Sequence, residues 1–228
     1  MAWITERLAD LTTAFLTQST VTAKTALSPH FVRIDLQADA FRTASWAPGC
    51  KVQMRPERTT LGLRTYTPFA WNTGEGTVSL VAYLHGTGPA GRWFDQVKPG
   101  DTCELMGPRR SLDLNGAAPE VVFVGDESSV GLAAVLRETR AEGVTYVLEA
   151  EDPAEYTEVL AGLGVTATVV AKKRHDLLNV TRSGTYDLVV TGDAATVGPI
   201  RRAARDWTPR PAKILGKAYW AEGRTGLD

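Results

Sequence analysis

Hydrophobic and polar residues alternate through much of the first half of the chain. Val32, Ile34 and Leu36 are separated by charged or polar residues, and residues 51–55 repeat the pattern. Because successive side chains of a strand point to opposite faces, this period of two predicts strands with one buried face. Further short strands, separated by turns rich in Gly and Pro, are expected at residues 64–67, 77–84 and 102–106. This spacing favours an antiparallel β-barrel over residues 20–116.

The pattern changes after residue 116 to continuous apolar runs separated by helical stretches. Residues 121–124 form one such run, as expected of a strand buried on both faces. Asp152 and Pro153 are typical of a helix start, with Asp as N-cap and Pro in the first position. Pro199 is expected either in the first turn of the last helix or as a break in it. Strands that alternate with helices predict a parallel sheet with helices on both faces, here over residues 117–228.

The N-terminal residues show a third pattern. Ile4, Leu8, Leu11 and Phe15 recur at helical spacing, so we expect a helix over residues 2–18 that packs on the outside of the barrel. The expected fold class is therefore β followed by α/β. Its parts are an N-terminal helix (1–19), an antiparallel β-barrel domain (20–116) and a parallel-sheet nucleotide-binding domain (117–228).

Composition narrows the range of functions. The chain has 228 residues, with 25 basic and 26 acidic residues and a net charge of -1, which gives no electrostatic reason to expect nucleic-acid binding. Its longest apolar runs are far too short to span a bilayer and no signal pattern opens the chain, so we expect a cytoplasmic protein without membrane insertion. Two cysteines and three widely separated histidines predict neither a disulfide framework nor a metal site. The oligomeric state stays open, a monomer included.

One strand combines a cation, an aromatic ring and a hydroxyl. Arg64 and Tyr66 alternate, so they share a face, and Thr67 follows. A guanidinium beside a flat ring suits a ligand with a phosphate and a planar heterocycle, whose edge Thr67 can hydrogen-bond. The alternative is an ordinary strand with one buried Tyr and one surface Arg.

A Gly-rich loop follows the strand that ends near His85. It contains Gly86, Gly88 and Gly91 and leads into a short helix expected at residues 92–97. Backbone N–H groups at such a helix start can bind an anion, and the glycines let the backbone approach a pyrophosphate. The alternative is a loop that only turns the chain.

Candidate ligand-binding residues of the second domain follow the predicted parallel strands. Ligands of open parallel sheets bind at the carboxyl ends of the strands. Here those ends carry residues 125–128, Glu149 to Asp152, and Gly192 with Asp193. Gly125 leaves room for a ligand, and Ser128 stands where a helix start could hold a phosphate. The usual G-x-G-x-x-G fingerprint is absent, and a Gly-Asp pair after a strand also fits a plain N-cap.

The order of these motifs resembles that of the siderophore-interacting protein family, flavin-dependent ferric-siderophore reductases of the ferredoxin-reductase-like superfamily. The resemblance covers about residues 21–226. It is carried by Arg64-Thr65-Tyr66-Thr67, His85 with Gly88-Pro89-Ala90-Gly91-Arg92-Trp93, Gly107-Pro108, Gly125-Asp126-Glu127-Ser128, and Tyr219-Trp220 with Gly223-Arg224.

The resemblance implies a set of binding residues. FAD would be held by Arg64, Thr65, Tyr66, Thr67, His85, Gly88, Ala90, Gly91, Arg92 and Trp93. NADH or NADPH would face Gly125, Asp126, Glu127, Ser128, Glu149, Gly192 and Asp193. Tyr66 and Thr67 would lie at the flavin edge, with Tyr219 and Trp220 over the reaction site. A basic rim for the siderophore would include Lys217 and Arg224, with Arg201, Arg202 and Arg205 as further candidates; the alternative is a solvated helix face.

The implied function is electron transfer from NAD(P)H through FAD to a ferric siderophore, a small-molecule chelate that then releases Fe(II). No side chain need act as acid, base or nucleophile, because the cofactors carry the chemistry. Another acceptor is the first alternative: a free flavin, a quinone, a natural product or a redox protein. The second is a non-catalytic ligand-binding protein that retains the fold.

The choice between NADH and NADPH depends on charge near the second parallel strand. Glu149, Glu151 and Asp152 suit a ribose hydroxyl and repel a 2′-phosphate, which favours NADH. A basic run at residues 172–174 could reverse this preference.

Overall fold

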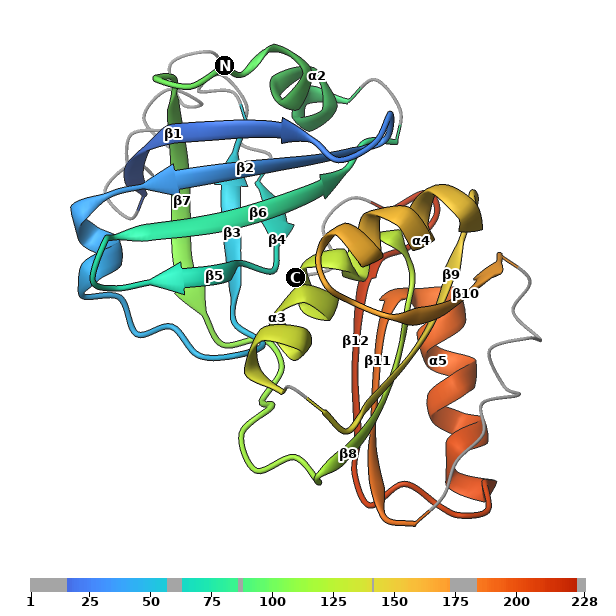
Figure 1. The fold of residues 1–228 in the computed structure, drawn as a ribbon. Helices are drawn as coiled ribbons and strands as arrows, with labels where there is room; N and C mark the ends of the chain where they lie inside the picture. The colour runs from blue at the N-terminus through green and yellow to red at the C-terminus, as the bar shows by residue number, and fades with distance from the viewer. Residues whose placement is uncertain (1–15, 57–62, 86–87, 141, 173–183, 225–228) are drawn as a thin grey trace, which may run out of the picture. The chain divides into compact units, whose positions relative to one another are not determined.

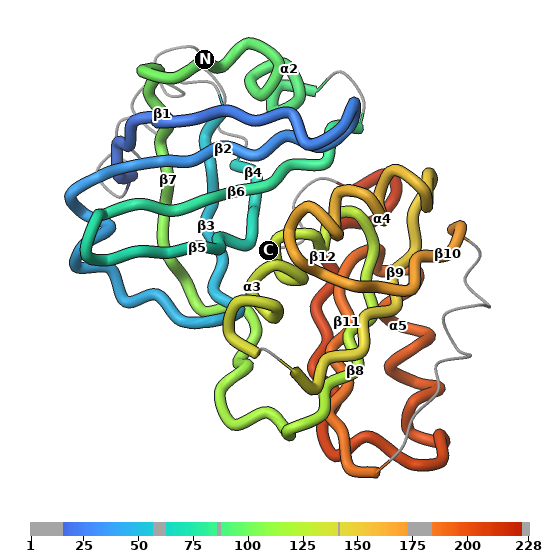
Figure 2. Tube along the Cα trace, in the orientation of Figure 1, coloured from blue at the N-terminus to red at the C-terminus, as the bar shows by residue number. Residues whose placement is uncertain are grey.

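The computed structural model describes residues 16–56, 63–85, 88–140, 142–172 and 184–224. The chain divides into two compact units, Met1–Arg110 and Ser111–Asp228 (Figures 1 and 2). Within the described ranges, no helix has the length and apolar character needed to span a membrane.

The first unit is built on one antiparallel sheet, in the order β4-β3-β7-β1-β2-β6-β5. Its strands are β1 (Thr17–Ala26), β2 (Phe31–Gln37), β3 (Lys51–Arg55), β4 (Arg64–Tyr66), β5 (Phe69–Asn72), β6 (Thr77–Tyr83) and β7 (Thr102–Arg109). The 3₁₀ turn η1 (Asp39–Arg42) follows β2, and helix α2 (Pro89–Gln96) follows β6. The sheet curls, so that β4 also contacts β6 (Figure 1).

The alternation seen in the sequence explains the core of this unit. Ile34 and Leu36 are fully buried, as are Met54 and Leu80 on neighbouring parts of the sheet. The intervening polar residues lie on the other face, where Arg33 Nε donates to Asp35 Oδ1 over 2.9 Å. In β2 a period of two therefore separates a packed face from a polar one, as predicted. In β3 the expectation of a single buried face is wrong, because Gln53 and Arg55 are buried as well, and Arg55 forms an ion pair with the buried Glu104.

Three local expectations for this unit need correction. Most of the helix expected at residues 2–18 lies outside the described residues, but β1 begins at Thr17, so its expected end is wrong. The short helix expected at residues 92–97 starts earlier, because Pro89 takes its first turn and Gly88 is its N-cap. Strand β5 was not expected from the sequence. Ala70 within it has a φ of 49°, a left-handed conformation that an alanine rarely adopts and that the sequence does not predict.

The second unit is a parallel sheet in the order β10-β9-β8-β11-β12. Its strands are β8 (Glu120–Gly125), β9 (Val144–Ala150), β10 (Ala167–Ala171), β11 (Tyr186–Asp193) and β12 (Ile214–Trp220). Its helices are η2 (Glu127–Ser129), α3 (Val130–Thr139), α4 (Pro153–Gly162), α5 (Ala194–Ala203) and η4 (Ala204–Asp206).

The strand order of this sheet reverses between β8 and β11. Because crossovers between parallel strands are right-handed, α3 and α4 cover one face and α5 covers the other (Figure 1). In open parallel sheets, such a reversal is where ligands bind, at the carboxyl ends of the strands. The predicted β followed by α/β fold class is thus confirmed.

The sequence analysis made predictions for the start of α4, from Asp152 and Pro153, and for the position of Pro199 in the last helix. Asp152 caps α4 as predicted, since its Oδ1 accepts from the backbone N–H groups of Ala154 and Glu155 at 3.0 Å. The expectation for Pro199 is wrong, because it lies inside α5, beyond the first turn, and the helix continues through it. Two contacts stabilise this helix. Asp193 caps its N-terminus by accepting from the Ala195 N–H, and Ile200 packs in the hydrophobic core of the unit.

Candidate functional site

A pocket of about 190 Å³ lies in the first unit. It joins β4, the end of β6 and the start of α2. Its lining includes six of the predicted FAD residues: Arg64, Tyr66, His85, Gly88, Ala90 and Gly91. The structure adds three lining residues that the sequence analysis missed: Tyr83, Leu84 and Phe94.

Strand β4 brings Arg64 and Tyr66 to this pocket together. They pair with Met54 and Val52 of β3, two residues apart, so their side chains share a face. The Arg64 side chain is exposed, and its Nη1 donates to its own neighbour, the Leu63 carbonyl, over 3.0 Å. This contact leaves most of the five guanidinium N–H donors able to bind a ligand anion.

Tyr66 is fixed by packing. Its ring meets the Phe94 ring edge-on, with centroids 5.6 Å apart, and it lies against the buried core of the unit. Burial raises the pKa of the Tyr66 phenol above its usual range, although the nearby Arg64 guanidinium opposes the shift. The phenol is therefore neutral at physiological pH and can both donate and accept a hydrogen bond.

The start of α2 supplies backbone donors. Gly88 is its N-cap, and no side chain within the described residues caps this end. Pro89 has no N–H, so the first-turn amides that can bind an anion are those of Ala90 and Gly91, both in the pocket lining. A cation, a neutral phenol and two helix-start amides around one pocket fit a ligand with both a phosphate and a ring.

Four predicted FAD residues do not line the pocket. Thr65 alternates with Arg64 and Tyr66 along β4, and Thr67 follows the strand. Arg92 is exposed on α2, whereas Trp93 packs on the core and meets Phe94 edge-on, with centroids 5.1 Å apart. One missed residue could have been found, since Tyr83 lies two positions before His85 and alternation puts both on one face.

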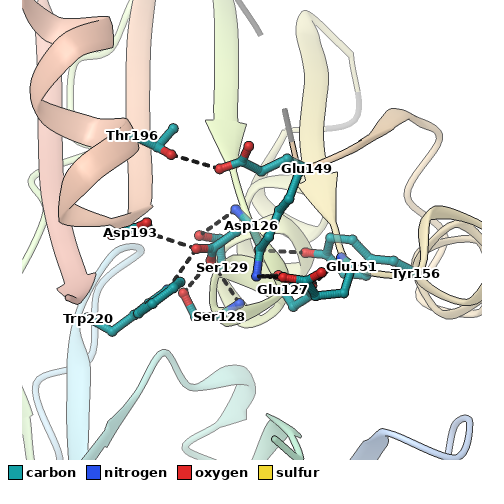
Figure 3. Close-up of polar contacts among 11 residues, drawn as sticks. Asp126, Glu127, Ser128, Ser129, Glu149, Glu151, Tyr156, Asp193, Thr196 and Trp220 are labelled. Atoms are coloured by element: carbon teal, nitrogen blue, oxygen red, sulfur yellow. Dashed lines mark hydrogen bonds and ion pairs between the residues drawn. The ribbon is translucent and has the colours of Figure 1, made fainter. Parts of the chain in front are cut away.

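The carboxyl ends of β8 and β11 in the second unit meet around the buried side chain of Asp126 (Figure 3). Its Oδ2 accepts from the backbone N–H of Asp193 over 2.9 Å and from the Trp220 indole over 2.8 Å. Its Oδ1 accepts from the backbone N–H and the hydroxyl of Ser128, so Asp126 is the N-cap of η2. The sequence analysis placed Ser128 where it could bind a phosphate of the ligand. In the structure its N–H and hydroxyl donate to the Asp126 carboxylate instead.

Two glycines allow this close approach. A Cβ on Gly192, whose φ is +114°, would lie 2.6 Å from the Asp126 carboxyl carbon. A Cβ on Gly125 would lie 2.7 Å from the side chain of Ser129, which itself bonds the Thr191 hydroxyl over 2.7 Å. Both predicted nucleotide-site glycines therefore have a structural reason to be glycine in this sheet.

Among the described residues, Lys172 lies between carboxylates at this edge. Lys172 Nζ is 3.2 Å from Glu127 Oε2 and 3.4 Å from Glu151 Oε1. The same Nζ lies 5.3 Å from the centroid of the Trp220 ring, within cation–π range. Glu127 is buried, and its Oε1 also accepts from the Glu151 backbone N–H over 2.7 Å. The positive charge of Lys172 is therefore balanced by the Glu127 and Glu151 carboxylates. Lys173 and Arg174 lie outside the described residues.

Glu149 is buried at the carboxyl end of β9, and only one of its oxygens is satisfied (Figure 3). Its Oε1 accepts from the Thr196 hydroxyl over 2.8 Å, whereas its Oε2 has no hydrogen-bond partner among the described residues. Burial raises the pKa of Glu149, with the Asp126 carboxylate adding to the shift and Lys172 opposing it. Burial likewise raises the pKa of Asp126, although hydrogen bonds from Ser128 and Trp220 lower it.

The raised pKa of Glu149 predicts a pH-dependent penalty on folding. Between the usual Glu pKa and the raised one, the folded state holds a proton that the unfolded state has lost, so stability falls as pH rises. We expect Glu149→Gln to become more stable relative to the parent as pH rises above about 4.5, by up to about tenfold in the unfolding constant per pH unit. The gain should level off above the raised pKa.

Urea denaturation from pH 4 to pH 8 measures this difference. Glu158→Gln, which removes an exposed carboxylate of α4, is the matched control and should give a curve parallel to that of the parent. Parallel curves for Glu149→Gln as well would contradict the prediction.

The predicted rim residues lie on α5, on β12 and beyond them. Arg201, Arg202 and Arg205 are exposed, as is Arg224, whereas Lys217 is half-buried. Tyr219 and Trp220 end β12, and both are half-buried.

Comparison with known families concerns the first unit. No curated protein matches the chain in a sequence comparison. Residues 48–112 match the family model described as the siderophore-interacting FAD-binding domain. This segment includes β4, β6 and α2 and all the residues that line the pocket. The resemblance predicted from the sequence is therefore confirmed over the part of the chain that carries the pocket.

Solved structures resemble the chain over most of its length. A siderophore utilization protein from T. fusca shares 22% identity at a TM-score of 0.77, covering 93% of this chain and 95% of that one. The siderophore-interacting protein from Acinetobacter baumannii shares 16% sequence identity at a TM-score of 0.76, and the match covers 92% of each chain. A ferredoxin NADP⁺ reductase from Neisseria gonorrhoeae, solved with bound FAD and NADP, shares 14% sequence identity at a TM-score of 0.67. The match covers 90% of this chain and 99% of that one. At these identities the likeness establishes a ferredoxin-reductase-like fold.

Proposed function

We propose that this protein binds FAD in the pocket of its first unit and transfers electrons from NAD(P)H to a ferric siderophore, releasing Fe(II). The observation that carries the proposal is that Arg64, Tyr66 and the start of α2 line one pocket. The match of residues 48–112 to the siderophore-interacting FAD-binding domain supports both FAD as the occupant and a siderophore as the electron acceptor.

The chain's own residues would bind and orient the cofactor. The Arg64 guanidinium and the α2 amides would bind phosphate oxygens, and the Tyr66 ring would stack on the isoalloxazine. The chemistry that FAD supplies when bound is the conversion of a two-electron donor into single-electron transfers, which Fe(III) requires. No side chain of the pocket need act as acid or base.

The second unit would bind the nicotinamide nucleotide at the carboxyl ends of β8 and β11. This edge has Asp126, Glu127, Glu149 and Glu151 close together, and its one described lysine is paired with two of them. Glu151, whose side chain is exposed, would accept from ribose hydroxyls, and the negative charge at this edge would repel a 2′-phosphate. We therefore propose NADH as the reductant.

On this basis, kcat/KM for NADH should exceed that for NADPH by at least about tenfold, which corresponds to about 1.4 kcal/mol. Steady-state oxidation of each nucleotide, with the protein saturated with FAD, measures the ratio. Lys172→Gln should raise the ratio or leave it as it is, because it removes the positive charge that pairs with Glu127 and Glu151 at this edge. A preference of the parent for NADPH that Lys172→Gln abolishes would instead assign Lys172 to the 2′-phosphate.

The function is tested by isolating the protein with FAD and following NADH-dependent reduction of ferric chelates, with Fe(II) trapped by a colorimetric chelator. Ferric hydroxamate, catecholate and carboxylate complexes are compared with free flavin and a quinone. Reduction of a ferric siderophore at a higher kcat/KM than the other acceptors supports the proposal. Faster turnover of a quinone or free flavin assigns a different acceptor. A protein that neither carries nor binds flavin is a non-catalytic member of the fold.

A further inference from the structure

Four hydrogen-bond donors converge on one carboxylate at the carboxyl end of β8 (Figure 3). Asp126 Oδ2 accepts from the Asp193 backbone N–H over 2.9 Å and from the Trp220 indole over 2.8 Å. Its Oδ1 accepts from the backbone N–H of Ser128 over 2.9 Å and from the Ser128 hydroxyl. Three of these donors are N–H groups, which cannot accept, so they stabilise the ionised form of the carboxyl group.

The Asp126 carboxylate lies where open parallel sheets bind the phosphates of a dinucleotide. Strand β8 leads into η2 and α3, and the strand order reverses beside it, between β8 and β11. At such a reversal, the pyrophosphate lies against backbone N–H groups of the turn that follows the strand. Here those N–H groups bind a side chain of the chain itself, and Asp126 is only 1% exposed. The space that the four donors enclose is therefore already filled by an anion.

The other helix starts at this edge are filled in the same way. Asp152 Oδ1 accepts from the N–H groups of Ala154 and Glu155 at the start of α4, each over 3.0 Å. Asp193 Oδ1 accepts from the Ala195 N–H at the start of α5, over 2.9 Å. Within the described ranges, each helical segment that follows a strand at this edge thus begins with an Asp that uses first-turn N–H groups. These are the groups that α/β units offer to a phosphate.

The charge around Asp126 adds a second obstacle to a phosphate. Glu127 is buried next to it, and the Glu151 side chain is 68% exposed at the same edge. Lys172 pairs with both of these carboxylates, over 3.2 and 3.4 Å. With Asp126 included, these residues carry more negative than positive charge, so they repel an approaching anion.

We propose that Asp126 is an internal anion that occupies the phosphate position of the second unit, so that the reductant binds there through its nucleoside parts and not through its pyrophosphate. This inference rests on the proposed function, because it takes a nicotinamide nucleotide as the reductant. It makes Asp126 a residue that determines specificity without touching the ligand. Ligands with the same base and ribose should bind this edge equally well with or without phosphates.

The test compares adenosine with ADP as competitive inhibitors of NADH oxidation by the FAD-loaded protein. Ferricyanide serves as the electron acceptor, so that the measurement does not depend on a siderophore. For the parent, the inhibition constants of the two ligands should agree within about threefold. Free helix-start donors would instead favour ADP by at least about tenfold, because one charge-assisted hydrogen bond contributes about that factor or more.

Two substitutions of Asp126 should create the missing preference. Asp126→Ala leaves the donors of Ser128, Asp193 and Trp220 for a phosphate, so ADP should inhibit at least about tenfold more strongly than adenosine. Asp126→Asn keeps the shape but removes the charge, and it should shift the ratio in the same direction by a smaller factor. A purely structural role of Asp126 would weaken both ligands together and leave their ratio unchanged.

Glu151→Gln is the matched control, because it removes an exposed carboxylate of the same edge that binds none of the four donors. Its ratio of inhibition constants should stay within about threefold of the parent's, as expected for an exposed charge that water and salt screen. Circular dichroism of each variant verifies that the fold is retained.

Three outcomes would overturn the inference. The first is a parent protein that ADP inhibits at least about tenfold more strongly than adenosine, and this comparison decides the matter even where no variant folds. The second is a folded Asp126→Ala protein in which ADP still inhibits no better than adenosine. The third is an equal shift of the ratio in Glu151→Gln. If the FAD-loaded parent oxidises no NADH with any acceptor, the proposed function itself fails, so the two failures are distinguishable.

Discussion

Arg64→Ala should lower the affinity of the apo-protein for FAD by about a hundredfold. A charge-assisted hydrogen bond is worth about 1.5–3 kcal/mol, and the guanidinium can make two to a phosphate. The α2 amides and the Tyr66 ring would remain, so binding should weaken without being abolished. The thermal stability of the apo-protein should hardly change, because Arg64 is exposed and its one described hydrogen bond goes to the adjacent Leu63 carbonyl.

Fluorescence titration of the apo-protein with FAD measures the affinity, and a thermal melt of the same samples measures the stability. Arg42→Ala is the control, since it removes an exposed guanidinium of the same unit that pairs only with Asp39 and the Gly74 carbonyl among the described contacts. It should leave FAD affinity within about threefold of the parent. Equal FAD affinity in Arg64→Ala and the parent would show that the pocket does not bind phosphate through Arg64.

Gly192→Ala should destabilise the protein by about 3 kcal/mol or more. A φ of +114° is a conformation that side chains rarely adopt, and the new Cβ would lie 2.6 Å from the Asp126 carboxyl carbon. Asp126 cannot move aside cheaply, because its carboxylate is buried and accepts from Asp193, Ser128 and Trp220. Displacement would leave a buried carboxylate and several donors unpaired.

Chemical denaturation, followed by far-ultraviolet circular dichroism, measures this loss. Gly116→Ala is the matched control in the same unit, because its φ is also positive, at +64°, but nothing lies within 4 Å of the added Cβ. It should cost about 1 kcal/mol, the backbone penalty alone. Equal losses in the two variants would mean that the contact with Asp126 does not constrain Gly192.

Much of the fold follows from patterns that are local in the sequence. Alternation around Ile34 predicts a strand with one buried face, and the continuous run at residues 121–124 predicts a strand buried on both. Asp152 and Pro153 predict a helix start that the structure has. Each of these features depends on residues within one turn or one strand, so the local sequence contains the necessary information.

The sequence by itself also put Arg64 and Tyr66 on one face, because a strand has a period of two. It could not place Phe94 beside them, since the pocket forms only when β4, β6 and α2 come together in the curled sheet. Nor could it show that Asp126 accepts from Asp193 and Trp220, which lie 67 and 94 residues further along the chain. Local periodicity fixes which way a side chain points; what it meets there depends on the packing of distant segments, which only the tertiary structure decides.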